Sequence, residues 1–224
     1  MGLEEWQEII ALTASISTIL QFLTGIMVCQ KFVEKGSTGN TSCFPFICGF
    51  LSCSLWLRYG FLINEESMIL VNTIGGTLFL AYCMTYLFYS IKKSVVARQI
   101  FGVLCILIIC IGYTTFIEEK HEIAVFRMGV LCCTTTVIFI AAPLATLMHV
   151  IKTKSTESLP FPMILSSCFV SLQWWLYGII LNDIFVQLPN FLGFALSIFQ
   201  LGIFLCYPST PTKTAGYNLV SHQF

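Results

Sequence analysis

The stretch WLRYG (Trp56–Gly60) occurs a second time as WWLYG (Trp174–Gly178), 118 residues further along the chain. In both copies an Asn and an acidic residue follow, at positions 64–65 and 182–183. A fixed internal period indicates a repeated structural unit. The same offset brings further residues into register: Asn190 over Asn72, Gly193 over Gly75, and Ser155-Thr156 over Ser37-Thr38.

The composition predicts a membrane protein. Of the 224 residues, 57% are hydrophobic and 10% are charged, whereas a soluble domain has about 25% charged residues. Because apolar stretches and short loops account for nearly the whole chain, there is no room for a separate catalytic or nucleic-acid-binding domain. We therefore expect neither an enzyme nor a nucleic-acid partner. Seven stretches are long enough to cross a bilayer, which takes about 20 residues: 8–28, 44–63, 68–89, 98–117, 125–148, 160–181 and 184–206.

The offset groups these stretches into two units of three helices, 8–90 and 125–206, and leaves stretch 98–117 without a counterpart. A unit of three helices crosses the membrane an odd number of times, so a second copy joined directly would be inverted. The extra helix restores its orientation. We therefore predict an all-α integral membrane protein with two parallel triple-helix repeats joined by an inverting fourth helix, which is a plan that transporters use. Residues 207–224 form a tail.

The charges predict the orientation. Eight of the eleven Lys and Arg residues fall on one side of the predicted spans, and that side is normally cytoplasmic. The N-terminus is then outside and the tail cytoplasmic. The tail contains YNLV (Tyr217–Val220), which has the form of a tyrosine-based sorting signal. The plasma membrane and the Golgi are both compatible with the sequence, as is a homo-oligomer in the lipid bilayer.

Two pairs of residues at the repeat offset are candidates for a binding site. Trp56 and Trp174 lie well inside their spans, and Asn72 and Asn190 are uncharged amides within apolar sequence. A buried indole alone is equally well explained by packing between helices. As pairs across an interface, the tryptophans would form two flat walls and the amides would offer hydrogen-bond donors and acceptors. This combination suits a flat, uncharged, hydroxyl-rich ligand such as a sugar.

No ionisable group lies at mid-depth in the predicted spans, although proton-coupled carriers usually have one. We expect uncoupled, bidirectional transport. The cysteines are scattered through apolar stretches without metal-ligand histidines, so we expect no metal and no cofactor.

Proline residues lie near the cytoplasmic ends of three spans, at Pro45, Pro143 and Pro160. Proline removes a backbone donor and can kink a helix, or it can simply end one. The offset places Gly25 at the position of Pro143. These four residues are candidates for a hinge.

The sequence resembles the SWEET sugar transporters, in particular their animal branch. The resemblance lies in STGNTSCFPF (37–46), CSLWLRYG (53–60), VNTIGG (71–76), APLATLMHVIKTKSTESLPF (142–161) and WWLYG (174–178). It implies a seven-helix uniporter for monosaccharides or disaccharides that works by alternating access. It also implies that Trp56, Asn72, Trp174 and Asn190 bind the substrate, that Tyr59, Tyr177 and Asp183 form an outer gate, and that Gly25, Pro45, Pro143 and Pro160 act as hinges.

Two other classes of protein share part of this pattern. A seven-helix receptor has the same topology, but it would not contain the repeat and would commonly carry motifs that are missing from this sequence. A membrane scaffold that transports nothing is compatible with the topology, but it leaves the paired polar residues at mid-depth without a purpose.

Overall fold

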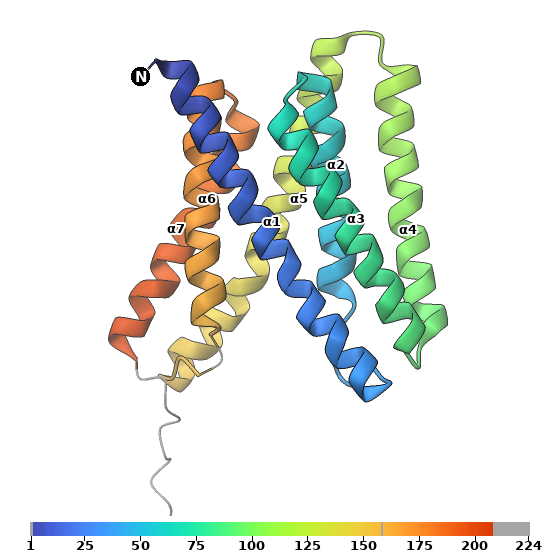
Figure 1. Cartoon of the computed structure of the whole chain (residues 1–224), viewed down its shortest axis with the longest axis vertical. Coiled ribbons are helices and arrows are strands. Elements are labelled where there is room, and N and C mark those ends of the chain that lie inside the picture. The colour runs from blue at the N-terminus through green and yellow to red at the C-terminus, as the bar shows by residue number, and fades with distance from the viewer. Residues whose placement is uncertain (1, 158, 208–224) are drawn as a thin grey trace, which may run out of the picture.

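A computed structural model describes residues 2–157 and 159–207 (Figure 1). This part of the chain forms seven α-helices with no strand, as the sequence predicted, and seven segments in it are long and apolar enough to span a membrane. A single turn of π-helix, η1 (Tyr113–Ile117), follows the fourth helix. The helices are α1 (Leu3–Lys35), α2 (Phe44–Ile63), α3 (Glu66–Tyr89), α4 (Lys93–Gly112), α5 (His121–Thr153), α6 (Phe161–Leu181) and α7 (Ile184–Cys206).

The helices form two halves with the same arrangement. In the first half, α3 packs against both α1 and α2, and in the second half, α7 packs against both α5 and α6. The halves meet where α1 packs against α6 and α2 packs against α5. In Figure 1, α1 and α5 run diagonally and cross between the halves, and α4 lies to one side of the first half. The structure therefore has two parallel triple-helix repeats and one additional helix.

Helix α4 is attached to the first half by Arg58, a residue without a charged counterpart in the second half, where Leu176 occupies its position. The Arg58 guanidinium donates to the Thr114 hydroxyl (2.9 Å), the Thr114 carbonyl (3.1 Å) and the Thr115 hydroxyl (3.1 Å). These bonds tie the last turns of α2 to η1, which directly follows α4.

The repeated Asn-acid pairs form the turns between helices. Asn64 ends α2 and Asn182 ends α6, both with a left-handed backbone (φ of 54° and 53°). Asparagine tolerates this conformation better than most residues. The acid that follows each Asn is the residue just before the next helix, and Asp183 caps α7 by accepting from the Phe185 and Val186 backbone N–H groups (2.9 and 3.4 Å).

The glycine of each W-x-x-Y-G stretch lies where the next helix approaches closely. A side chain at Gly178 would come within 2.9 Å of the Gln187 backbone nitrogen, and one at Gly60 within 3.2 Å of Met68 Cβ. Glycine therefore lets α6 and α7, and likewise α2 and α3, form tight hairpins.

Two helices are longer than the sequence predicted. Helices α1 and α5 each have 33 residues, whereas the predicted spans were 8–28 and 125–148. The ends of both helices contain charged residues, which mark the limits of the apolar span but do not interrupt the helix. The two halves are thus alike in the length of their first helix as well.

We call the face of the bundle where α1 begins the N-face and the opposite face, where α7 ends, the C-face. Buried residues of both halves form one apolar cluster, which runs the length of the first half and whose members in the second half, such as Met128 and Tyr177, lie toward the N-face. At the C-face, the second half has a separate cluster that includes Leu147, Leu159 and Ile203. The halves diverge toward the C-face in Figure 1. The structure is therefore closed at the N-face.

Candidate functional site

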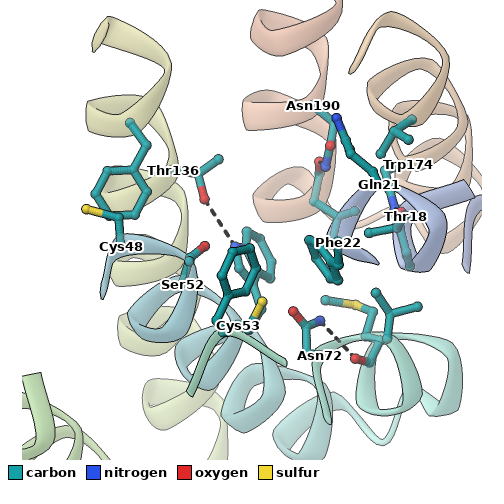
Figure 2. Close-up of a pocket in the computed structure, with 18 residues that line it drawn as sticks. Thr18, Gln21, Phe22, Cys48, Ser52, Cys53, Asn72, Thr136, Trp174 and Asn190 are labelled. Atoms are coloured by element: carbon teal, nitrogen blue, oxygen red, sulfur yellow. Dashed lines mark hydrogen bonds between the residues drawn. The ribbon is translucent and has the colours of Figure 1, made fainter. Parts of the chain in front are cut away.

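A cavity of about 330 Å³ lies between the two halves (Figure 2). This volume is at the lower end of the range for small-molecule sites. It extends from the two predicted tryptophans toward the C-face, and its lining contains no Asp, Glu, Lys, Arg or His among the described residues. Three pairs of identical residues at the repeat offset line it: Thr18 and Thr136, Trp56 and Trp174, and Asn72 and Asn190.

Each tryptophan is held by a threonine of the other half. Trp56 on α2 donates its indole N–H to the Thr136 hydroxyl on α5 (3.1 Å), and Trp174 on α6 donates to the Thr18 hydroxyl on α1 (2.8 Å). In turn, Thr18 donates to the Ala14 carbonyl and Thr136 to the Cys132 carbonyl. Because each hydroxyl points its hydrogen at one of these carbonyls, a lone pair of its oxygen faces the indole N–H. The two threonines were not among the residues predicted from the sequence.

The two asparagines have matching environments as well. Asn72 donates its amide to the Met68 carbonyl one turn earlier in α3 (2.8 Å), and Asn190 donates to the Val186 carbonyl in α7 (2.8 Å). Each bond fixes the side chain against its own helix and uses one donor hydrogen. The rest of each amide remains available at the cavity (Figure 2).

Beyond these pairs, the walls of the cavity differ. Gln21 has Phe139 as its counterpart, and Ser52 has Val170. Polar bonds also join α1 to α6, because Ser17 donates to Gln173 Oε1 (2.6 Å) and Gln21 donates to the Ser167 hydroxyl (2.9 Å). The corresponding positions on α5 and α2 include Phe139 and Gly49, which cannot form such bonds. One seam between the halves is therefore polar and the other largely apolar.

The residues predicted for a gate lie above the cavity, toward the N-face. The Tyr59 hydroxyl donates to Asp183 Oδ2 (2.7 Å), and the Tyr177 hydroxyl donates to Glu65 Oε1. Each bond joins one half to the other. Each tyrosine also packs edge to face against the tryptophan one turn below it, with ring centroids 5.6 Å apart for Trp56 and 5.5 Å apart for Trp174. Glu65 was not among the predicted site residues, although the repeat offset makes it the counterpart of Asp183.

The four predicted hinge positions have different surroundings. Gly25 is helical, in the middle of a continuous α1, and a side chain there would come within 2.3 Å of the Tyr82 ring. Pro45 is the second residue of α2, and Pro160 precedes the first residue of α6. Pro143 belongs to a continuous α5, but its side chain lies outside the described part of the structure. Close packing of an aromatic ring is thus a second reason for glycine at position 25.

Comparison with known proteins identifies the family. The family model described as "Sugar efflux transporter for intercellular exchange" matches twice, at residues 8–94 and 126–212. The chain is 50% identical to the sugar transporter SWEET1 of Drosophila pseudoobscura pseudoobscura, over 95% of both chains. It is 35% identical to SWEET1 of Caenorhabditis elegans, over 92% of this chain and 67% of that relative.

A solved structure of a eukaryotic SWEET transporter has the same fold. It superposes with a TM-score of 0.80 over 89% of this chain and 97% of the solved chain, at 24% sequence identity. The match of the family model to both halves of the chain and the identity with the two SWEET1 relatives agree with this. The chain is a multi-pass membrane protein and belongs to the SWEET family of sugar efflux transporters for intercellular exchange.

Proposed function

We propose that this protein carries monosaccharides or disaccharides across a membrane, passively and in both directions, by alternating access. The observation that supports this most directly is the uncharged cavity between two repeats, with paired tryptophan, asparagine and threonine residues in its lining. The curated relatives are named as sugar transporters, among them a bidirectional sugar transporter of rice.

The chemistry of the paired residues suits a sugar. Trp56 and Trp174 provide apolar faces for the C–H groups of a sugar ring, and Asn72 and Asn190 provide amides for its hydroxyls. Each hydrogen bond contributes a net gain of about 0.5–1.5 kcal/mol, and stacking adds to it. Desolvation of the sugar and its loss of translational and rotational freedom offset part of this gain. An affinity near the millimolar range, about −4 kcal/mol, follows. A ligand held this weakly can leave on either side.

The two halves are joined by hydrogen bonds at the N-face and diverge toward the C-face (Figure 1), which suits one state of an alternating-access cycle. In the proposed cycle, Tyr59, Tyr177 and Asp183 close the N-face, and Gly25, Pro45, Pro143 and Pro160 accommodate the change of helix direction near the C-face. Because the described residues that line the cavity carry no acidic or basic group, the sugar gradient alone drives transport in this proposal.

The C-face is cytoplasmic in this proposal, since seven of the ten Lys and Arg residues in the described part of the chain lie on that side. Lipid surrounds the outer surfaces of the helices, where large apolar side chains such as Leu20, Phe88 and Phe169 are exposed. The membrane is the plasma membrane or the Golgi membrane. The YNLV signal that bears on this choice lies outside the described residues.

Membership in a transporter family leaves the alternatives with little support. A receptor would not account for the match of the family model to both halves of the chain. An enzyme is excluded because the family transports sugars. A scaffold without transport activity remains the contrasting outcome of a transport assay.

The test is sugar uptake into liposomes that contain the purified protein, which does not depend on where the protein resides in a cell. We expect saturable uptake of labelled glucose or sucrose. Trp174→Ala and Asn190→Ala should each reduce uptake about tenfold or more, because each change removes contacts worth roughly 1.4 kcal/mol or more.

Trp175→Ala is the matched control, because Trp175 is adjacent in sequence but stacks on Phe194 (centroids 5.9 Å apart) and is not in the cavity lining. Uptake by Trp175→Ala should stay close to that of the wild type. If folded wild-type protein takes up neither monosaccharide nor disaccharide, the proposed function is wrong and the scaffold is favoured.

A further inference from the structure

A second cavity lies inside the second half, among α5, α6 and α7, with a volume of about 580 Å³. It extends from mid-depth, where Thr136 and Asn190 line it, to the loop at Leu159 and Pro160 on the C-face. Thr136, Phe139 and Asn190 also line the central cavity, so the two cavities adjoin. A molecule that leaves the central cavity toward the C-face passes the entrance to this second space.

Three polar side chains in this cavity have no hydrogen-bond partner among the described residues. Ser197 and Gln200 on α7 are 4% and 7% exposed, and Ser171 on α6 lies beside them in the lining. Within the described residues, the structure forms no hydrogen bond to any of these three side chains, and none of their polar atoms is enclosed by protein. Their hydroxyl and amide groups are therefore free to bond to a polar molecule that enters the cavity.

The first half contains aromatic side chains where the second half is hollow. The repeat offset places Phe79 at the position of Ser197 and Tyr82 at the position of Gln200. The rings of Phe79 and Tyr82 are 5.9 Å apart, and Phe22 packs against Phe79 at 5.3 Å. The space that is open and polar in one repeat is filled in the other by aromatic rings packed edge to face.

We propose that the cavity lined by Ser171, Asn190, Ser197 and Gln200 is a second sugar-binding subsite, which holds a sugar ring on the C-face side of the central cavity. This inference rests on the proposed function. Hydroxyl and amide groups bind a neutral polyol, and no Asp, Glu, Lys, Arg or His is among the described lining residues to favour a charged headgroup. Asn190 lines both cavities, so its amide can bond to a hydroxyl of the sugar in either one.

The geometry predicts an effect on one side only. A sugar that enters from the C-face meets the second cavity first, whereas a sugar that enters from the N-face meets the paired tryptophans when the gate opens. Loss of the subsite should therefore change the half-saturating concentration for entry from the C-face and leave that for entry from the N-face unchanged.

The experiment uses membrane vesicles with the full-length protein in one orientation, verified by protease access to its tail, and labelled glucose added at either face. Ser197→Phe places in α7 the residue that fills the first half. Ser197→Ala combined with Gln200→Leu removes the polar groups without adding a ring. Both variants should raise the half-saturating concentration at the C-face about threefold to tenfold and change the N-face value less than about twofold, as expected for one lost hydrogen bond.

Ile198→Phe is the matched control, because Ile198 is the neighbouring residue on α7 but is 49% exposed on the outside of the bundle. It should change neither value. Equal half-saturating concentrations in wild type and both cavity variants would overturn the subsite. So would native mass spectrometry that finds a phospholipid on the wild type and not on Ser197→Phe, with transport kinetics unchanged. Wild-type vesicles without any transport would instead contradict the proposed function itself.

Discussion

At the residue scale, the positions of the two cavity tryptophans depend on single hydroxyl groups. Trp174 and its acceptor Thr18 are both buried, with 8% and 7% exposure, whereas Trp56 is only partly buried against Thr136. A buried donor that loses its acceptor costs about 1–3 kcal/mol. The Thr18 hydroxyl should therefore matter more than the Thr136 hydroxyl, although the repeat makes the two residues formally equivalent.

We predict that Thr18→Val lowers the thermal unfolding temperature and raises the half-saturating sugar concentration about fivefold or more, because the indole N–H is left without an acceptor at a cost of about 1 kcal/mol or more. Thr136→Val should have a smaller effect. The measurements are the unfolding midpoint in detergent and sugar uptake into liposomes.

Thr18→Ser is the control, because serine retains the hydroxyl and can accept from Trp174. It should behave like the wild type. Equal losses in Thr18→Val and Thr18→Ser would show that the methyl group, and not the hydrogen bond, is the important part of this side chain.

Gly25 presents a different case, since its role follows from a neighbour that is 57 positions away in the sequence. The buried Tyr82 ring lies against the Gly25 backbone, donates its hydroxyl to the Phe22 carbonyl (3.1 Å), and is held by Phe46 and Phe79. We predict that Gly25→Ala lowers stability by about 1–3 kcal/mol, because an added methyl group overpacks this site. Thermal unfolding measures this loss.

Two further variants test the explanation. Gly102→Ala on α4 should cause no loss, because a side chain there would meet nothing within 4 Å. Adding Tyr82→Leu to Gly25→Ala should recover part of the lost stability by removing the ring. If Gly25→Ala were as stable as the wild type but transported poorly, flexibility of α1 would be the better explanation for the glycine.

At the scale of the elements, each W-x-x-Y-G stretch combines three tasks within about one and a half turns of helix. Its Trp faces the central cavity, its Tyr bonds to the other half, and its Gly allows the next helix to approach. The cross-repeat bonds of Tyr59 and Tyr177 are the polar contacts that hold α2 and α6 near the opposite half at the N-face. Breaking one should weaken closure without affecting either half.

We predict that Tyr59→Phe shifts the protein toward a state that is open at the N-face. A hydrogen bond to a charged group contributes about 1.5–3 kcal/mol, so the ratio of open to closed molecules should rise by about tenfold or more. The measurement is the distance distribution between fluorescent labels introduced as non-natural residues at Phe61 and Ile179, which are exposed near the N-face ends of α2 and α6.

Tyr86→Phe provides the matched control. The Tyr86 hydroxyl donates to the Thr41 carbonyl (2.7 Å), a bond within the first half near the C-face. Its loss should leave the distance distribution unchanged. A Tyr59→Phe protein with the same distribution as the wild type would mean that apolar packing alone closes the N-face.

Much of this element-level organisation is encoded in the repeat offset. The offset was sufficient to predict two three-helix units, the separate fourth helix and the tryptophan and asparagine pairs. Applied to every polar residue, it would also have brought Thr18 together with Thr136 and Glu65 with Asp183. What it could not reveal is the difference between the halves, because a cavity depends on whether facing side chains fill a space. The replacement of Phe79 by Ser197 has no local sequence signal.

At the scale of the whole molecule, the two halves behave as bodies joined near the N-face. One apolar cluster spans both halves there, whereas the C-face end of the second half packs only against itself within the described structure. Helix α4 packs against α2 and α3 of the first half, and the segment that follows it contacts the second half at η1 and in the next loop, where Arg127 of α5 pairs with Glu118. This organisation permits the halves to rock about the central cavity, with a neutral ligand between them.

The absence of charge from the described cavity lining has a consequence for energy coupling. A side chain that titrates between about pH 5 and 8 is normally histidine, and the described lining contains none and no carboxylate. We predict that the initial rate of uptake into liposomes changes less than about twofold over this range, and that uptake is not accompanied by proton movement, measured with a pH-sensitive dye inside the liposomes.

Asn190→Asp offers the matched test, because it is nearly isosteric and introduces one titratable group into the cavity. In its neutral form at low pH, the carboxyl group can bond to a sugar hydroxyl much as the amide does. As pH rises and the group ionises, the charge must be kept solvated in a site of low polarity, which opposes closure around a neutral sugar. Transport by this variant should therefore fall with increasing pH, while the wild type stays level. Wild-type uptake that rises steeply as the external pH falls, with proton entry, would mean that a group outside the cavity couples transport to protons.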